Sequence, residues 1–210
     1  MKYISVIDME ISNIKSIVGA INYFGFKTIV TKDENIILNS SAMILPGVGS
    51  FPAGMKKLKN NKLDQVIKKF IKTKKPVLAI CLGYQMLFSS SNEFQLTKGL
   101  NILKGKVLSL KSLKTNRLCP NLGWNTVDYK KNKKNKLFNK LNSKLETYFV
   151  HSFFVKTKIK NLETSTINFG GKKIMSSIQY ENIFGMQFHP EKSGKNGLKI
   201  IKNFLNQIKN

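Results

Sequence analysis

A short apolar run followed at once by a cysteine constrains the fold of this chain more than any other feature. Val77–Ile80 is unbroken in its apolar character and follows Pro76, which is typical of a strand buried on both faces of a sheet. Cys81 comes next, then Gly83 and an apolar segment of helical character up to Phe88. This order predicts a thiol at the carboxyl edge of a sheet and at a helix N-terminus, where the helix dipole favours a thiolate. A buried structural cysteine is the alternative interpretation.

The segments before this strand alternate between strand and helix patterns. Strands are predicted at Tyr3–Asp8, Lys27–Val30 and Ser41–Leu45, and amphipathic helices at Ile11–Ile21 and Leu63–Ile71. A strand–helix–strand opening predicts a parallel sheet. Pro46–Phe51 has two glycines around Val48. This spacing suits either a loop whose backbone N–H groups bind a ligand or a plain turn from strand to helix.

The second half of the chain changes to successive β patterns after the polar segment Ser89–Glu93. They lie at Ile102–Leu110, Trp124–Tyr129, Thr147–Lys156, Glu163–Asn168, Lys173–Tyr180 and Ile183–Gln187. A last helix is predicted at Asn196–Ile208 from its apolar spacing. Because no internal repeat or linker divides the chain, we expect a single domain over residues 1–210.

Charge is the strongest compositional signal. The formal net charge is +25, and among 36 basic residues only Arg117 is an arginine. Arginine is the residue suited to bidentate recognition of phosphate and guanine. Lysines scattered among asparagines therefore predict a solvated surface and no specific nucleic-acid binding. The densest cluster, Lys130–Lys136, is expected to be an exposed loop, and non-specific contact with polyanions there is the alternative.

Hydropathy and cysteine content restrict the compartment. The 210 residues, 41% of them hydrophobic, suffice for one α/β domain with a core. No run approaches the roughly 18 apolar residues of a membrane span, and Met1–Asp8 enters a strand pattern without a signal-peptide core. Cys81 and Cys119 make no disulfide framework. We therefore expect a cytoplasmic protein without membrane contact.

The chain has two histidines, so a Cys–His mechanism has two candidate bases. His189 lies just past a predicted strand, and Pro190 favours an extended conformation for it. Since residues i and i+2 of an extended chain point the same way, Glu191 is predicted to lie beside His189 and to support its imidazolium. A surface turn is the alternative for this segment. His151 has no carboxylate two residues away, which favours a half-buried structural role.

Five motifs in chain order resemble those of a known family. They are Leu45-Pro46-Gly47-Val48-Gly49, Ile80-Cys81-Leu82-Gly83-Tyr84-Gln85, Gly123-Trp124-Asn125, Tyr148-Phe149-Val150-His151-Ser152 and Gln187-Phe188-His189-Pro190-Glu191-Lys192-Ser193. Together they resemble the class I glutamine amidotransferases and, within them, the glutaminase subunit of imidazole glycerol phosphate synthase. The resemblance implies an α/β, three-layer fold with a central, mostly parallel sheet, a nucleophile elbow and extra antiparallel strands in the C-terminal half.

The resemblance also implies a reaction. Cys81 would attack the side-chain amide of L-glutamine, His189 would protonate the leaving ammonia, and Glu191 would orient His189. A glutamyl thioester would then form and be hydrolysed. Neither a cofactor nor a metal is implied.

Further roles are implied for the residues around this triad. The backbone N–H of Leu82 and an amide of the Val48–Gly49 loop would hold the oxyanion, each good donor lowering the barrier by roughly 3 kcal/mol. Gln85 and Glu93 match positions that hold the glutamine head group, and the His151–Ser152 strand lines the same pocket. A carboxylate at Glu93 suits an α-ammonium, although taken alone it would pass as a solvated surface acid.

Two segments depart from the family pattern. The family usually has Asp-Tyr-Gly-x-Gly-Asn after the first strand, whereas Asp8–Asn13 keeps the first and last residues and neither glycine. Asn121 stands where histidine-pathway members usually have histidine. Because the first of these loops faces the synthase partner in the family, both departures concern the partner and not the triad.

Three hypotheses follow. The first is a glutaminase subunit that delivers ammonia to a separate synthase, a (β/α)8-barrel cyclase in a heterodimer. The second is a paralogue whose partner aminates or amidinates a surface-polysaccharide sugar. The third is a catalytically silent basic binding protein on the same scaffold.

Overall fold

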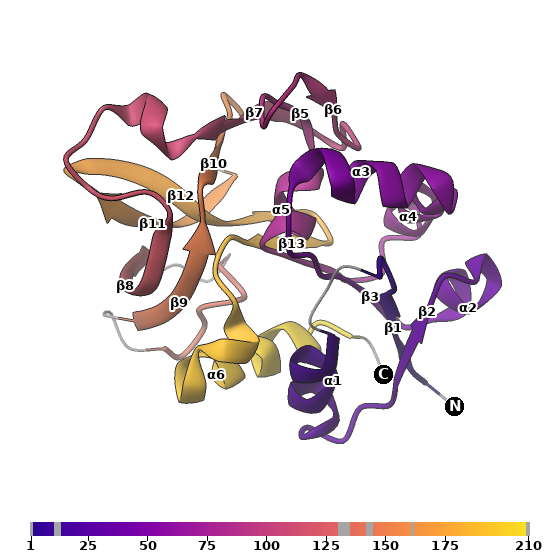
Figure 1. Cartoon of the computed structure of the whole chain (residues 1–210). Helices are drawn as coiled ribbons and strands as arrows, with labels where there is room; N and C mark the ends of the chain where they lie inside the picture. The colour runs from indigo at the N-terminus through magenta and orange to yellow at the C-terminus, as the bar shows by residue number, and fades with distance from the viewer. Residues whose placement is uncertain (1, 11–13, 130–134, 142–144, 161, 209–210) are drawn as a thin grey trace.

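A computed structural model describes residues 2–10, 14–129, 135–141, 145–160 and 162–208 (Figure 1). Its centre is one large twisted sheet. In spatial order the strands are β2 (Thr28–Thr31), β1 (Ile4–Ile7), β3 (Ala42–Leu45), β4 (Val77–Ile80), β13 (Ile183–Met186), β12 (Lys172–Tyr180), β11 (Glu163–Phe169), β8 (Asn121–Tyr129) and β9 (Leu145–His151).

The sheet has a parallel half and an antiparallel half. Every neighbouring pair from β2 through β13 is parallel. Every pair from β13 through β9 is antiparallel. The predicted parallel sheet with antiparallel strands from the C-terminal half is therefore confirmed, and β13 is the late strand that joins the parallel part.

Helices cover both faces of the parallel half. Helices α1 (Ile14–Asn22) and α6 (Gly194–Leu205) lie on one face, and α2 (Glu34–Asn39), α3 (Phe51–Asn60) and α4 (Leu63–Lys72) lie on the other (Figure 1). Alternate residues of the central strands join opposite cores: Leu78 packs on the side of α1 and α6, and Val77 on the side of α3 and α4. Burial on both faces explains why these strands read as unbroken apolar runs.

A second, smaller sheet corrects two predictions. It consists of β10 (Phe153–Lys156), β7 (Leu103–Ser109), β5 (Phe88–Ser91) and β6 (Thr97–Lys98), and a 3-10 turn, Leu110–Leu113, follows β7. The single strand predicted at Thr147–Lys156 is wrong, because the chain bends at Ser152 and passes from β9 in the large sheet to β10 in the small one. The polar segment Ser89–Glu93 is partly strand, since its serines pair with β7.

Helix α3 is absent from the sequence-based prediction, and its residues show why. Pro52 and Gly54 near its start look like a continuation of the preceding loop. Proline is tolerated in the first turn of a helix, where its missing N–H has no intrahelical partner. Gly54 packs closely against α5 (Leu82–Met86), where a Cβ would lie 2.8 Å from the sulfur of Met86. Tertiary packing, and not helix propensity, decides this segment.

The loop after β1 is the first of the two departures from the family pattern. Residues 11–13 of this loop, where the first predicted helix was expected to begin, lie outside the described residues, as does most of the Lys130–Lys136 cluster. Glu10 is described and has a φ of 59°, the left-handed conformation in which glycine is the usual residue. Its carboxylate pairs with Lys32 and with Lys57, and these two ammonium groups hold the pKa of Glu10 well below its usual range. The N–H of Glu10 donates to Oδ1 of Asp8 at 2.9 Å, so this chain forms at residue 10 a turn in which glycine is the usual residue.

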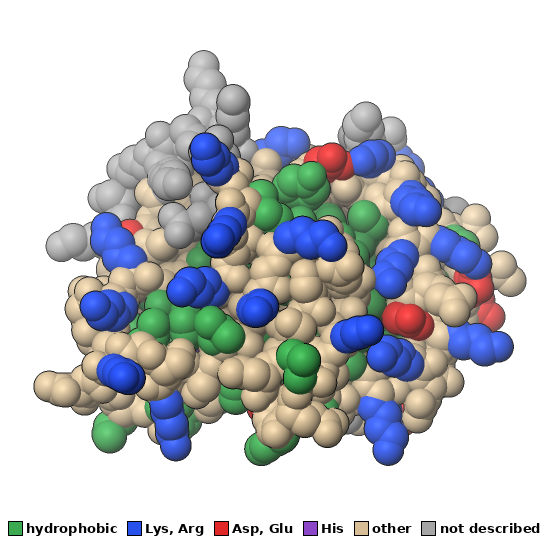
Figure 2. Space-filling view, turned by 90° about the horizontal axis from the view of Figure 1, so that it is seen from above, with side chains coloured by type: hydrophobic (Ala, Val, Ile, Leu, Met, Phe, Trp, Pro, Cys, Tyr) green, Lys and Arg blue, Asp and Glu red, His purple; other side chains and the backbone are tan. Residues whose placement is uncertain are grey.

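Basic side chains are dispersed over the face seen in Figure 2. Lysine and arginine side chains stand apart, with uncharged surface between them. This arrangement agrees with the expected solvated surface. Within the described ranges, no helix has both the length and the apolar character to cross a membrane.

Candidate active site

Cys81 lies in a sharp turn between β4 and α5, at the carboxyl end of the parallel strands. Its backbone has φ 52° and ψ −111°, a conformation that costs a non-glycine residue of order 1–3 kcal/mol. Gly83 makes the turn feasible, because a Cβ there would lie 2.0 Å from the carbonyl oxygen of Leu45. The Cys81 N–H donates to the carbonyl of Met186 at 2.8 Å and joins the turn to β13. The predicted nucleophile elbow is present.

His189 and Glu191 form a buried pair close to this elbow. The Nδ1 of His189 is 2.7 Å from Oε1 of Glu191, and their side chains are 3% and 6% exposed. His189 is extended, as Pro190 predicted, with φ −98° and ψ 96°. Glu191, however, lies in a 3-10 turn, Pro190–Lys192, so the predicted extended geometry beyond His189 is wrong. The turn, and not strand alternation, brings the carboxylate back to the imidazole.

The charge state of His189 follows from its neighbours. Burial by itself lowers the pKa of this imidazole, but interactions with Cys81 and Glu191 outweigh it and raise the pKa to about 10. Nε2, the nitrogen away from Glu191, has no partner with hydrogen-bond geometry among the described residues. The interaction with Cys81 is therefore looser than a directed hydrogen bond, as is common for catalytic pairs before substrate binds.

A cavity of about 310 Å³ opens over Cys81, within the range of small-molecule sites. Its lining residues are Val48, Gly49, Cys81, Leu82, Gln85, Glu93, Pro120, Val150, His151, Ser152, Phe153 and His189. Every residue predicted for the site is among them except Glu191. The carboxylate of Glu191 contacts Nδ1 of His189 and does not line the cavity. The structure thus collects positions from six separate segments around one thiol.

Gln85 enters this cavity from α5, and Glu93 enters it from the bend that follows β5. Oε2 of Glu93 accepts the N–H of Phe51 at 2.7 Å, at the start of α3, whose N-cap residue makes no side-chain hydrogen bond. Burial raises the pKa of Glu93, and the Phe51 N–H opposes this shift. Glu93 is therefore a half-buried carboxylate in the wall of the cavity that contains the thiol. The alternative of a solvated surface acid is wrong.

His151 is a structural residue of the cavity wall. Its Nδ1 donates to the carbonyl of Phe153 at 2.8 Å, so its Nε2 accepts from Nδ2 of Asn121 at 2.9 Å. Burial lowers the pKa of His151 to about 4, although the Phe153 carbonyl partly opposes this. A neutral imidazole with both nitrogens engaged is no base for Cys81. Asn121, the second departure from the family pattern, supplies one of its two hydrogen bonds.

One of the two predicted oxyanion donors is occupied. The N–H of Leu82 donates to the carbonyl oxygen of Gly47 at 3.3 Å, so it is not free to bind an oxyanion in this conformation. Val48 and Gly49 are exposed, and Gly49 has a φ of 93°, which only glycine adopts without strain. The Val48–Gly49 loop therefore lines the cavity, as expected, while the carbonyl of the preceding Gly47 occupies the Leu82 donor.

Two contacts to the site are missing from the sequence-based prediction. Gln187 is buried, and its Nε2 donates to the sulfur of Cys81 at 3.7 Å. Its position at the end of a predicted strand and two residues before His189 was a signal, although the chain bends at residues 187 and 188. The carbonyl of Phe153 accepts from both His151 and Gln85. Such a contact cannot be predicted from the amino acid at position 153, because every residue has a backbone carbonyl.

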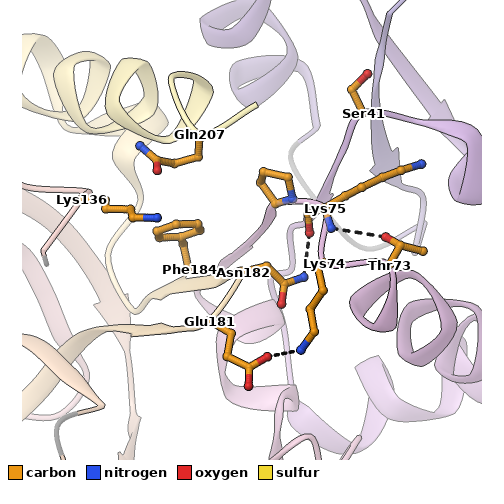
Figure 3. A pocket seen from close by; sticks show the side chains of 10 residues that line it. Ser41, Thr73, Lys74, Lys75, Lys136, Glu181, Asn182, Phe184 and Gln207 are labelled. Atoms are coloured by element: carbon orange, nitrogen blue, oxygen red, sulfur yellow. Dashed lines mark hydrogen bonds and ion pairs between the residues drawn. The ribbon is translucent and has the colours of Figure 1, made fainter. Parts of the chain in front are cut away.

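A larger cavity, about 550 Å³, opens at the amino ends of β3, β4 and β13. Figure 3 shows Lys136, Phe184 and Gln207 along one side of it and the ion pair between Lys74 and Glu181 along another. Its described lining residues include neither a cysteine nor a histidine. Cys81 and both histidines of the chain line the smaller cavity instead.

Comparison with known proteins identifies the family. The sequence profile of the family described as glutamine amidotransferase class-I matches residues 5–208. The chain belongs to the class I glutamine amidotransferases. Members of this family are enzymes, and the amidotransferase fold explains the elbow at Cys81.

Relatives of this amidotransferase chain are similar over nearly their whole length. An imidazole glycerol phosphate synthase subunit HisH 2 of Vibrio vulnificus is 45% identical, covering 98% of this chain and 95% of that protein. Subunit HisH of Caldanaerobacter subterraneus is 40% identical, covering 98% of each. Subunit HisH of Lactococcus lactis is 38% identical, covering 99% of this chain and all of that protein.

Solved structures agree on the amidotransferase fold. The structure of PurLQS from Thermotoga maritima aligns with a TM-score of 0.76 at 20% identity over all of both chains. A putative GMP synthase protein from Thermoplasma acidophilum aligns with a TM-score of 0.74 at 18% identity, covering 99% of this chain and 94% of that one. At such identities these likenesses support the fold alone.

Proposed function

We propose that this chain is the glutaminase subunit of an imidazole glycerol phosphate synthase, with Cys81, His189 and Glu191 as its triad. The observation that carries the proposal is the strained thiol at the cavity floor beside a buried histidine–carboxylate pair. The HisH relatives, 38–45% identical, support the pathway. The surface-sugar alternative gains no support from these relatives.

The reaction follows from the positions of these groups. The thiolate of Cys81 attacks the side-chain amide carbon of L-glutamine, and the carbonyl oxygen becomes an oxyanion. His189 donates its proton to the leaving nitrogen, ammonia departs, and a thioester is left on Cys81. His189 then takes a proton from water, which attacks the thioester and releases glutamate. Glu191 holds the imidazole in one tautomer and supports its positive charge throughout.

Substrate binding involves the rest of the cavity. Glu93 is the carboxylate that pairs with the α-ammonium of glutamine, and its attachment to the start of α3 fixes its position. Gln85 contacts the head group, and Ser152 closes the same side of the cavity. Leu82 and the Val48–Gly49 loop hold the oxyanion once the N–H of Leu82 leaves the carbonyl of Gly47. We therefore expect low activity of the isolated chain and activation when the loop changes shape.

The surface beside the cavity has exposed apolar side chains that favour the binding of a partner chain. Leu122 pairs with Val150 in the register of β8 and β9, and Trp124 pairs with Tyr148, so these side chains share one face. Leu122 and Trp124 are 63% and 55% exposed. Val48 of the oxyanion loop is exposed too. A synthase subunit with a (β/α)8 barrel, bound over this face as a heterodimer, would cover the apolar surface and receive the ammonia.

The test is a pair of cysteine variants assayed with the cyclase subunit of the same organism. Cys81→Ala removes the nucleophile, and glutamine-dependent synthesis falls by at least about a thousandfold, while synthesis from added ammonia persists. Cys119→Ala serves as the matched control and keeps both activities. Undiminished glutamine use by Cys81→Ala rejects the nucleophile. Failure of the two subunits to form a complex rejects the pathway but not the triad.

A further inference from the structure

Gln187 contacts the sulfur of the proposed nucleophile, yet it belongs to none of the roles assigned above. Its side chain is 1% exposed at the end of β13. Nε2 lies 3.7 Å from the sulfur of Cys81, within hydrogen-bond range for a sulfur acceptor. Oε1 accepts from Nε2 of Gln85 at 2.9 Å. Gln187 thus connects the cavity wall to the thiol.

The hydrogen-bond network fixes the direction of both amides. The carbonyl of Phe153 can only accept, so Gln85 must turn its NH₂ group toward it, at 3.2 Å. The second hydrogen of this NH₂ group points to Gln187, so Gln187 must accept it with Oε1. Gln187 consequently presents its own NH₂ group to Cys81. A reversed amide would place two donors against each other, so the sulfur receives a donor and not an acceptor.

The donor of Gln187 and the imidazole of His189 come from neighbouring positions of the chain. Gln187 and His189 follow β13 and are separated by one residue; Gln187 contacts the sulfur of Cys81, and His189 lines the same cavity. A hydrogen bond to a charged acceptor is stronger than one to a neutral acceptor. Donation from Gln187 therefore favours the thiolate over the thiol. The thiol form can itself donate to the carbonyl of Val150, 3.9 Å from the sulfur, and the amide of Gln187 opposes this preference for the thiol.

The geometry points to Gln187 as a sulfur-binding residue of the reaction, a fixed amide donor that stabilises the Cys81 thiolate with its direction set through Gln85 by the Phe153 carbonyl. This inference rests on the proposed function, because it takes Cys81 as the nucleophile. It makes Gln85 an acceptor toward substrate, since both hydrogens of its amide are already used within the chain.

The experiment measures alkylation of the purified chain by iodoacetamide as a function of pH, with the modified residue identified by mass spectrometry. Gln187→Met keeps the approximate length of the side chain and removes the donor. Gln187→Glu removes the donor and keeps an acceptor for Gln85. Gln207→Met, near the larger cavity and distant from the thiol, is the matched control. Thermal unfolding of each variant establishes that it is folded.

We expect the wild-type chain to be alkylated at Cys81 in preference to Cys119. In Gln187→Met the alkylation profile shifts upward by about one pH unit, which slows the reaction about tenfold on its acidic limb. Gln187→Glu shifts it at least as far, because a carboxylate beside the sulfur also repels the thiolate. The Gln207→Met profile matches the wild type.

Two results would overturn the inference in different ways. An unshifted profile in folded Gln187→Met, with Cys81 still the reactive cysteine, shows that Gln187 only fills space and leaves the proposed function intact. If wild-type Cys81 is no more reactive than Cys119, the proposed nucleophile is rejected and the role of Gln187 with it.

Discussion

The two ends of the parallel sheet both carry a cavity, and the larger one is not the candidate site. At the amino end most charged groups have partners: Lys74 pairs with Glu181, and the ammonium of Lys75 donates to the carbonyl of Leu38 and lies over the ring of Phe70. Of the described residues lining that cavity, only Asn182 leaves a buried polar atom, its Oδ1, without a partner.

At the carboxyl end the situation is reversed. Nε2 of His189 and Oε2 of Glu191 are buried without partners among the described residues. Lys74 and Glu181 at the amino end also have positive φ, but Cys81 combines φ 52° with ψ −111°, which lies outside the left-handed helical region. Unmet polar groups and strain are costly in a folded chain, and they persist mainly where chemistry uses them. Cavity size alone would have pointed to the wrong end of the molecule. The following predictions test this difference.

The largest effect is expected at the carboxyl end from His189→Gln. This change removes the group that transfers protons, and glutamine hydrolysis in the synthase complex should fall by at least about a thousandfold. Glutamine hydrolysis is measured as glutamate release, with synthesis from added ammonia as the control. Retained hydrolysis would show that the imidazole is not the acid–base group.

Glu191→Gln should reduce glutamine hydrolysis by roughly 10²–10⁴-fold, because the imidazole loses its tautomer control. It should also change the pH dependence of stability. The raised pKa of His189 stabilises the folded chain below about 6.5, and this contribution is lost as the pH rises through about 10. The melting temperature of the wild type should therefore fall over this range more steeply than that of Glu191→Gln. Parallel curves would contradict the assigned charge on His189.

At the amino end, Asn182→Ala should affect stability and not activity. The side chain donates to the carbonyls of Ile71 at 3.1 Å and Lys75 at 2.7 Å, and it ties the end of α4 to β4. Loss of these bonds should lower the free energy of unfolding by about 1–3 kcal/mol, measured by urea denaturation. An equal loss of glutaminase activity would mean that the two ends of the sheet are coupled.

The smallest effect is expected for Glu181→Gln, also at the amino end. Its partner Lys74 and the carboxylate are 68% and 51% exposed, and exposed ion pairs contribute little. The free energy of unfolding should change by less than about 1 kcal/mol, and this small change should shrink further in high salt. A larger, salt-independent loss would show that the pair supports the cavity structurally.

Some elements could be predicted because their own residues determine their structure. The unbroken strand at Val77–Ile80 and the elbow at Cys81 could be predicted from residue type and spacing. The His189–Glu191 pair could be predicted too, but the expected extended geometry was wrong, because a 3-10 turn joins the two side chains. Helix α3 and strand β5 could not, because their formation depends on packing against distant segments. The same holds for the bend at Ser152, which divides a continuous strand pattern between two sheets.

The parts of the site that escaped prediction are mostly backbone interactions. The N–H of Leu82 was expected to be free, but whether the Gly47 carbonyl faces it depends on one peptide orientation that no residue type reports. Glu93 could be assigned to the cavity, yet its attachment to the first N–H of α3 required the three-dimensional position of a helix that the sequence did not reveal. The sequence places Gln187 at the end of a predicted strand, but it does not indicate a contact with the sulfur of Cys81.

The carbonyl oxygen of Phe153 has a consequence for how this site can evolve. It accepts from His151 and from Gln85, and so it sets one tautomer and two amide directions. A backbone atom is not changed by substitution of its own side chain. Drift at position 153 can therefore alter the shape of the cavity while leaving the polarity of its wall unchanged. The fold of the backbone therefore fixes the hydrogen-bond directions in the site. The side chain at position 153 can change to suit a different substrate or partner without altering them.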